Sequence, residues 1–158
     1  MERSLTAASG RTFVGGTLLA LFCLAATAGH AAQSLDLDAL QGRVVYLDFW
    51  ASWCAPCRQS FPWMSAMHKA YESQGLTIIA INVDHDRADA QRFLQTFQPK
   101  FEIWFDSEGS WAERFKVSGM PTSIIIDRHG VARFTHIGFW PGDSDVSAQQ
   151  IRELLAER

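Results

Sequence analysis

Hydrophobic residues follow two alternating patterns along this chain of 158 residues. Short runs rich in valine, isoleucine and phenylalanine are typical of β-strands. They cover residues 43–49, 76–83, 101–105, 123–127 and 131–137. Between these runs, apolar residues recur at the spacing of one helix face. That spacing predicts helices over residues 57–73, 87–98, 110–116 and 144–157.

The order of these elements predicts an α/β domain with a mixed sheet. The first strand, the first helix and the second strand are connected at crossover length, which predicts a parallel pair. Both strands are almost continuously apolar, so we expect them in the buried centre of the sheet. Arg128-His129-Gly130 separates the last two strands and predicts a hairpin. The fold class expected is therefore a central mixed β-sheet flanked by helices.

The spacing predicts a core face for each helix, and for residues 87–98 it is Ala90, Phe93, Leu94 and Phe97. The first presents Phe61, Met64, His68 and Tyr71. The closing helix presents Val146, Ile151, Leu154 and Leu155, and either Asp143 or Ser144 suits its N-cap.

The first 32 residues differ from the rest of the chain. Arg3 and Arg11 give a basic start, and residues 13–28 are apolar and small. Small residues up to Ala32 then offer cleavage sites, which is the order of a secretory signal peptide. An uncleaved membrane anchor is the alternative, although the apolar run is short for a spanning helix. We expect a signal peptide over residues 1–32, an exported, periplasmic location, and one domain over residues 33–158.

Composition and charge exclude some functions. The formal net charge is −3, with no cluster of lysine and arginine, so nucleic-acid binding has no support. Of the three cysteines, Cys23 lies in the expected signal peptide. The remaining Cys54 and Cys57 cannot build a disulfide framework, so the pair is free for exchange chemistry.

The two remaining cysteines lie where the first strand gives way to the first helix, in the sequence Cys54-Ala55-Pro56-Cys57. At a helix N-terminus, unpaired N–H groups and the helix dipole favour a thiolate. We therefore expect a lowered pKa for Cys54, which makes it the nucleophile. Cys57 follows one turn later, close enough to form a disulfide with Cys54. The pair predicts a dithiol/disulfide switch.

Two other interpretations of the cysteine pair are weaker. A zinc site needs four ligands, and the sequence offers no second cysteine pair and no suitably spaced histidines. A structural disulfide with so short a loop is uncommon. No metal and no separate cofactor are expected beyond the redox-active disulfide itself.

Two further acidic positions allow alternative interpretations. Asp48 lies in a strand that is expected to be buried, where a carboxylate is costly unless paired or protonated. It is either a turn residue that points outward or, as we favour, a buried acid with a raised pKa that exchanges protons with Cys57. Asp84-His85-Asp86 follows the second strand and suits either a metal site or, more commonly, a solvated turn.

The chain resembles a known family over nearly all of residues 33–158. Residues 48–57, Asp-Phe-Trp-Ala-Ser-Trp-Cys-Ala-Pro-Cys, and residues 119–122, Gly-Met-Pro-Thr, are similar to the two motifs of the thioredoxin fold. The segment 84–108 resembles the central insert of the exported TlpA-like (ResA/DsbE-like) thiol-disulfide oxidoreductases. The resemblance implies a thioredoxin fold with that insert.

The resemblance also implies roles for individual residues. Cys54 would be the exposed nucleophile and Cys57 the resolving thiol. Pro121 would be a cis-proline that lies against the disulfide, and the backbone of Met120 would pair with an incoming chain. Trp53 would shield one side of the site, with a core position as the alternative. These implications make Cys54, Cys57, Asp48 and Pro121 the expected catalytic residues, and Trp53, Met120 and Pro56 the expected contacts to the partner.

Three departures from the family pattern affect the expected roles. Asp48 stands where many TlpA-like proteins have asparagine, and Ser60 where many have glutamate. The lysine that lies near the buried acid in thioredoxin aligns with Ala80. The segment Val117-Ser118-Gly119 does not favour the cytochrome c maturation branch.

The function expected is reduction of disulfides in specific exported proteins, in cytochrome c or copper-site assembly. A DsbD/CcdA-like membrane protein would supply electrons, and the enzyme would act as a monomer. The alternatives are a periplasmic oxidant or isomerase, and a copper-delivery module that uses the two thiols as soft ligands.

Overall fold

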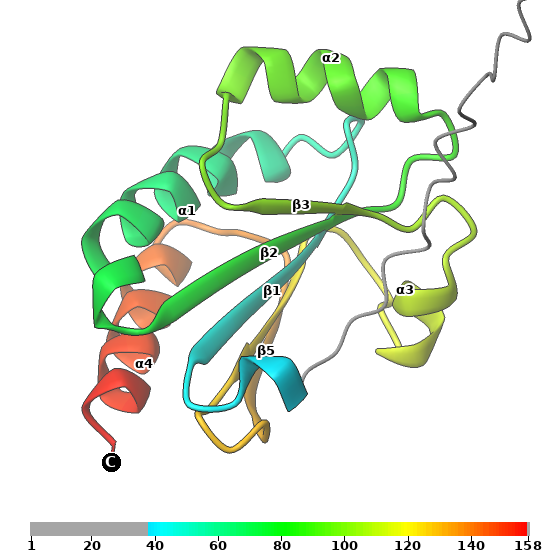
Figure 1. The fold of residues 1–158 in the computed structure, drawn as a ribbon. Coiled ribbons are helices and arrows are strands. Elements are labelled where there is room, and N and C mark those ends of the chain that lie inside the picture. Colours follow the sequence, from blue (N-terminus) through cyan, green and yellow to red (C-terminus); the bar gives the residue numbers. More distant parts are fainter. Residues whose placement is uncertain (1–37, 158) are drawn as a thin grey trace, which may run out of the picture. The chain divides into compact units, whose positions relative to one another are not determined.

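A five-stranded mixed sheet in the order β3-β2-β1-β4-β5 forms the centre of the fold (Figure 1). The structure is a computed structural model that describes residues 38–157. Strands β1 (Val44–Trp50), β2 (Leu76–Asn82) and β3 (Glu102–Phe105) are parallel. Strand β4 (Thr122–Ile126) runs antiparallel to β1 and to β5 (Ala132–Ile137). The predicted mixed sheet is confirmed, and it has the arrangement of a thioredoxin fold.

In the part of the chain that the structure describes, four α-helices and two short 3₁₀ helices surround the sheet. They are α1 (Cys57–Tyr71), α2 (Arg87–Phe97), α3 (Ser110–Arg114), α4 (Asp143–Ala156), η1 (Asp38–Leu40) and η2 (Glu72–Gln74). Side chains of α1, α2 and α4 share one hydrophobic cluster with the sheet, whereas side chains of α3 and η1 join the cluster on the other face. Figure 1 shows α3 apart from α1 and α4, across the sheet. Segment 84–108, the expected insert, provides α2 and the edge strand β3.

Strand β1 is buried along its whole length and divides its side chains between the two clusters. Successive side chains of a strand point to opposite faces. Tyr46 and Trp50 belong to the cluster with α1, and Leu47 and Phe49 to the other. By the same alternation Asp48 faces the side of α1, which is also the side of the two cysteines.

An aromatic cluster attaches α2 to the start of α1. The ring centroid of Trp50 lies 4.8 Å from that of Phe61 and 4.7 Å from that of Phe93. Phe61 and Phe93 are 4.8 Å apart. Aromatic pairs at such distances add stability beyond the area that they bury. The cluster therefore connects the end of β1, α1 and α2 directly beside the redox pair.

Some predictions about the helices were wrong in detail. Val146 is 49% exposed, because the buried stripe of α4 passes instead through Ser147, Ile151 and Leu154. Neither predicted residue caps α4. The helix already begins at Asp143, and Gly142, with φ 96°, occupies the N-cap position.

The buried face of α1 also differs from the prediction. Phe61 and Met64 are buried, but His68 and Tyr71 are only half-buried. Met67, which was not in the predicted set, is buried instead.

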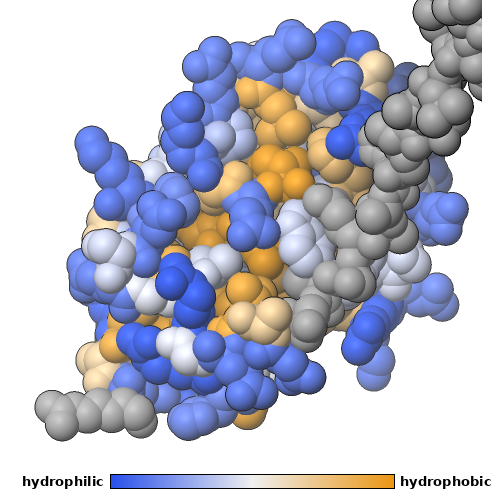
Figure 2. Space-filling view, in the orientation of Figure 1, coloured by the Kyte–Doolittle hydropathy of each residue, from blue (hydrophilic) through white to orange (hydrophobic). Residues whose placement is uncertain are grey.

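The surface of the described residues mixes the two kinds of side chain. Figure 2 gives the view of Figure 1 and shows hydrophobic residues in the middle of this face, between hydrophilic ones. Among residues 38–157, no helix is both long and apolar enough to cross a bilayer. The predicted signal peptide over residues 1–32 lies outside the described residues.

Candidate active site

Cys54 and Cys57 form a disulfide between the end of β1 and the start of α1. Helix α1 begins at Cys57, and Pro56 occupies the N-cap position. The Cys57 N–H donates a hydrogen bond to Cys54 Sγ over 3.2 Å. A main-chain N–H at a helix N-terminus thus points at the sulfur that was expected to be the nucleophile. Such a donor stabilises a thiolate more than a thiol, because hydrogen bonds to ionised acceptors are stronger.

The two sulfur-bearing residues differ little in exposure. Cys57 is completely buried, and Cys54 is 3% exposed. Cys54 is therefore less exposed than the resemblance implied, although it is the member of the pair that reaches the surface. Trp53 beside it is 71% exposed, so the alternative of a core position for this residue is wrong. Pro56, two residues after Cys54 in the sequence, is half-buried.

A cis peptide bond joins Met120 to Pro121. Thr122, the next residue, pairs with Phe49 of β1, so Pro121 lies near the end of β1 that leads to the cysteines. The Gly138 N–H donates to the Pro121 carbonyl over 2.7 Å and holds this segment to β5. Within residues 38–157, the backbone N–H and C=O of Met120 form no hydrogen bond. These groups are therefore free to pair with another chain.

Asp48 is a buried carboxyl group, 1% exposed. Its neighbours across the sheet are Ala80 on β2 and Ser123 on β4, so a methyl group and a hydroxyl group, and no lysine, occupy the paired positions. Oδ2 of Asp48 has no hydrogen-bond partner among the described residues. Burial raises the pKa of this carboxyl group well above its usual range. The interpretation as an outward turn residue is wrong.

Tyr46 lies two residues before Asp48 on the same face of β1. Burial, and next the nearby Asp48 carboxylate, raise the pKa of Tyr46 well above its usual value. The phenol therefore stays protonated throughout the physiological range.

Asp84 was missed as a site residue. It is 5% exposed, so the expected solvated turn is wrong at this position. Its carboxylate accepts hydrogen bonds from the Ser52 N–H at 2.9 Å and the Ser52 hydroxyl at 3.1 Å. Asp86 caps α2 by accepting from the Ala88 N–H, and His85 contacts the Ser107 carbonyl. No group of three or more potential metal-ligating His, Cys, Asp or Glu side chains occurs in residues 38–157.

The sequence carries a signal that would have identified Asp84. Asn82 and Asp84 are polar residues at the carboxyl end of a buried strand. That strand, β2, pairs in parallel with β1, with Trp50 opposite Asn82. Side chains at the carboxyl ends of neighbouring parallel strands meet at the same edge of the sheet. A carboxylate there can reach the loop that follows β1.

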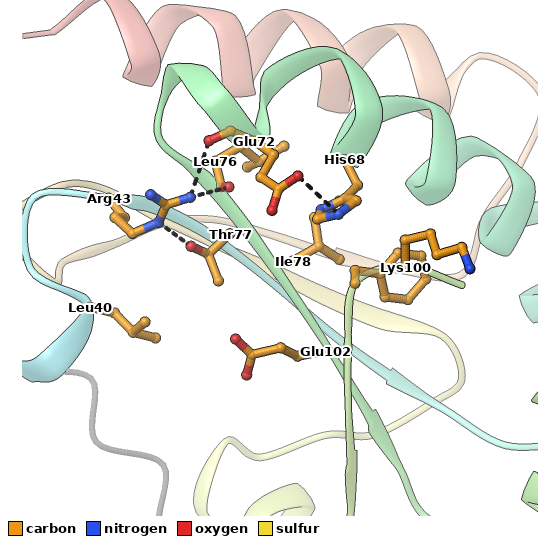
Figure 3. Close-up of a pocket in the computed structure, with 10 residues that line it drawn as sticks. Leu40, Arg43, His68, Glu72, Leu76, Thr77, Ile78, Lys100 and Glu102 are labelled. Carbon is orange, nitrogen blue, oxygen red and sulfur yellow. Dashed lines mark hydrogen bonds and ion pairs between the residues drawn. The ribbon is translucent and has the colours of Figure 1, made fainter. Parts of the chain in front are cut away.

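The hollow drawn in Figure 3 lies at the other end of the parallel strands. It has a volume of about 370 Å³ and is lined by the first residues of β2 and β3 and by the end of α1. Arg43 points toward Thr77 and also donates to the carbonyls of Glu72 and Leu76. His68 pairs with Glu72 at 3.4 Å. Since these polar groups satisfy one another, the hollow is a weaker candidate than the cysteine site.

The fold and this site define a thioredoxin-like domain with a Cys-x-x-Cys disulfide after β1 and a cis-proline near the same end of that strand. The chain belongs to the Redoxin family, whose model matches residues 14–150.

Among curated proteins, the chain is similar to thiol-disulfide oxidoreductase ResA of Bacillus subtilis (strain 168). The two are 32% identical over 98 residues, which cover 62% of this chain and 55% of the relative. ResA of Halalkalibacterium halodurans is 30% identical over 123 residues, covering 78% of this chain and 68% of the relative. The chain thus spans little more than half the length of the Bacillus subtilis relative.

Solved structures agree with the family. A Chlorobium tepidum protein, provisionally named thiol:disulfide interchange protein DsbE, is 46% identical with a TM-score of 0.74. The similarity covers 76% of this chain and 85% of that chain. StoA from Bacillus subtilis is 25% identical with a TM-score of 0.60, covering 74% and 84% of the two chains. The predicted resemblance to ResA/DsbE-like proteins is therefore confirmed.

Proposed function

We propose that this protein is an exported thiol-disulfide oxidoreductase that reduces disulfides in partner proteins. The observation that carries the proposal is the hydrogen bond from the Cys57 N–H to Cys54 Sγ, at the one cysteine of the pair that reaches the surface. A thiolate at Cys54 is stabilised there and is accessible to a partner. The similarity to ResA of two bacilli supports the same activity.

The reaction begins with the reduced protein. The Cys54 thiolate attacks one sulfur of the partner disulfide, the partner S–S bond breaks, and its second sulfur leaves as a thiolate. A mixed disulfide now joins Cys54 to the partner. Cys57 then loses its proton, and its thiolate attacks Cys54 Sγ. The partner leaves fully reduced, and the Cys54–Cys57 disulfide remains.

Asp48 is the proposed proton acceptor for Cys57. It lies on the face of β1 that carries the cysteine pair, and its raised pKa makes its ionised form a stronger base than an ordinary carboxylate. The unpartnered Oδ2 leaves an oxygen available for a proton. The residue would return that proton when the pair is reduced again.

Partner binding is proposed to use the segments on either side of the disulfide. The unpaired main-chain groups of Met120 would bond to the extended backbone of the partner next to Pro121. Trp53 would contact partner side chains from the other side, because 71% of its surface is exposed. Pro56 would contribute a rigid edge between the two cysteines.

The cellular setting is part of the proposal. A reductant in the oxidising periplasm needs a continuous supply of electrons, so we propose a DsbD/CcdA-like membrane donor. The substrates proposed are cysteines of apocytochrome c or of copper sites in oxidase assembly. An oxidant or isomerase is the alternative within the same chemistry. A copper module would bind Cu(I) through both thiols and Met120.

The test combines the reduction potential with partner capture. A potential near about −270 mV supports a reductant, and one near about −120 mV supports an oxidant. A copper module would instead bind Cu(I) tightly and reduce insulin poorly. Cys57→Ser should trap mixed disulfides at Cys54 in the exporting cell, and Cys54→Ser should trap none. If Cys57→Ser captures no protein, the proposal of a partner reductase fails.

A further inference from the structure

We infer that Asp84 is a positioning residue for the redox loop, which is residues 51–56 between β1 and α1. It holds Ser52 and thereby keeps Cys54 Sγ against the N–H of Cys57. The inference rests on the proposed oxidoreductase function. It adds a residue from the loop after β2, 32 positions along the chain from the residue that it holds. Asp84 does not touch the reacting sulfur in this account. It acts through the main chain of the loop.

The first step is the geometry of the contact. Oδ2 of Asp84 accepts from the Ser52 N–H at 2.9 Å, and Oδ1 accepts from the Ser52 hydroxyl at 3.1 Å. Both donors of one residue are therefore bound by both oxygens of one carboxylate. Two bonds to the same residue restrain its orientation as well as its position. The carboxylate is nearly buried, so water competes little for its oxygens.

The second step is how Asp84 itself is fixed. Its Oδ2 also accepts from the Asn82 side-chain amide at 2.8 Å, and its N–H donates to Asn82 Oδ1 at 3.1 Å. Asn82 is the last residue of β2 and is 1% exposed. The Val83 N–H bonds to the Trp50 carbonyl at 3.0 Å. The anchor is thus built on two central strands rather than on a flexible loop.

The third step connects Ser52 to the sulfur. A tight turn closes between Ala51 and Cys54, whose N–H donates to the Ala51 carbonyl at 3.1 Å. Ser52 lies inside this turn, so its placement sets the direction in which Cys54 leaves. The carbonyl of Ser52 also accepts from Arg58 at 3.2 Å, on the exposed side. Cys54 Sγ then meets the Cys57 N–H at 3.2 Å.

Other roles for the Asp84 carboxylate do not fit its contacts. It does not cap α2, because Asp86 performs that function. It has no ion-pair partner among residues 38–157. Every group that donates a hydrogen bond to the Asp84 carboxylate belongs to the redox loop or to Asn82. Its contacts therefore serve the loop that carries Cys54.

The chain offers a matched control in Asp106. This residue follows β3, the next parallel strand, and is 4% exposed, close to the 5% of Asp84. Its carboxylate also accepts three bonds, from the Ser110 hydroxyl, the Trp111 N–H and the Ala112 N–H. Those donors belong to the start of α3 and not to the redox loop. Asp106→Ala should lose stability for comparable reasons, without disturbing Cys54.

The experiment measures two properties of the reduced protein in each variant. One is the rate of reaction with hydroxyethyl disulfide, a small neutral substrate that needs no partner surface. The other is the pH at which the Cys54 thiolate forms, followed by its ultraviolet absorbance. Unfolding curves for each variant are recorded in parallel. The variants are Asp84→Ala, Asp84→Asn, Ser52→Ala and Asp106→Ala.

We expect Asp84→Ala to react about tenfold more slowly at neutral pH and to form the thiolate at higher pH. Tenfold is about 1.4 kcal/mol, close to the lower end of the range for one hydrogen bond to a charged acceptor. Ser52→Ala keeps the main-chain bond and should be about twofold to threefold slower. Asp84→Asn retains an acceptor for the Ser52 N–H, so it should recover most of the rate. Asp106→Ala should keep the wild-type rate and titration.

Two results would overturn the inference while leaving the function intact. One is a wild-type rate and thiolate titration in both Asp84→Ala and Ser52→Ala. The other is an equal change in Asp106→Ala, which would mean that any loss of stability affects the site. If Asp84→Ala does not fold, Ser52→Ala decides the question by the same criterion. A wild-type protein that does not react with hydroxyethyl disulfide would instead refute the proposed function.

Discussion

Replacing Asp48 with asparagine should make the folded protein more stable, by an amount that depends on pH. The carboxyl group is 1% exposed, and burial raises its pKa well above the usual range. In the unfolded chain the same group has a pKa of about 3.9. Below that pH both states hold the proton, and the carboxyl group carries no penalty. As the pH rises, the unfolded state releases its proton first, so the wild-type protein loses stability.

The size of the effect follows from one proton. Stability then falls with a limiting slope of about 1.4 kcal/mol per pH unit until the pH passes the native pKa. Between about pH 4 and pH 5 the wild-type protein loses about 1 kcal/mol of stability. This is less than the limiting slope would give, because at about pH 4 the unfolded carboxyl group is only partly ionised. The asparagine side chain has nearly the same volume as that of aspartate and cannot ionise. The stability of Asp48→Asn relative to wild type should therefore increase by about 1 kcal/mol over that interval.

The assay is urea unfolding of the oxidised proteins, followed by far-ultraviolet circular dichroism at several pH values from 3 to 7. Using the oxidised form keeps Cys54 and Cys57 from titrating. Other carboxyl groups contribute equally to both proteins and cancel in the difference. Curves that stay parallel from pH 3 to pH 7 would refute the argument, because they would mean that the Asp48 carboxyl group ionises in the native state as it does in the unfolded chain.

Three further predictions concern the site and the sheet. Asp48→Ala should slow insulin reduction near neutral pH and slow it less at high pH, where Cys57 loses its proton without help; an equal loss at every pH would mean that Asp48 is structural. Trp53→Ala should lower kcat/KM about tenfold with a protein substrate and less with hydroxyethyl disulfide; equal losses would exclude a role in partner contact. Asp127 should show the opposite pH dependence to Asp48. Burial by itself would raise the pKa of Asp127, but hydrogen bonds from Val131, Arg133 and His129 together lower it by more. The net pKa therefore lies below its usual value. Its contribution to stability is therefore present above about pH 4 and is lost as the pH falls through the native pKa, so the stability deficit of Asp127→Asn should shrink in acid. A deficit that stays constant down to pH 2 would contradict this assignment.

The sequence alone determined the fold class and the redox pair. Strands and helices leave a local trace, because side chains repeat every two residues in a strand and about every 3.6 in a helix. The position of Cys54 and Cys57 at a strand-to-helix junction is equally local, since a helix N-terminus is defined by residues next to it in the chain. Asp48 was also accessible to this reasoning, because a carboxylate within an apolar strand is unusual whatever surrounds it.

Only the tertiary structure decided how these parts meet. The sequence shows that Asp84 follows the carboxyl end of a buried strand, but it does not show which loop lies beside that end. The difference arises because β2 pairs in parallel with β1 and brings Asp84 to Ser52. The same holds for the depth of Cys54, which is 3% exposed, and for Val146, which is exposed because Ser147 lies on the buried stripe instead. Burial and long-range hydrogen bonds depend on which elements pack together, and that packing is a property of the whole chain.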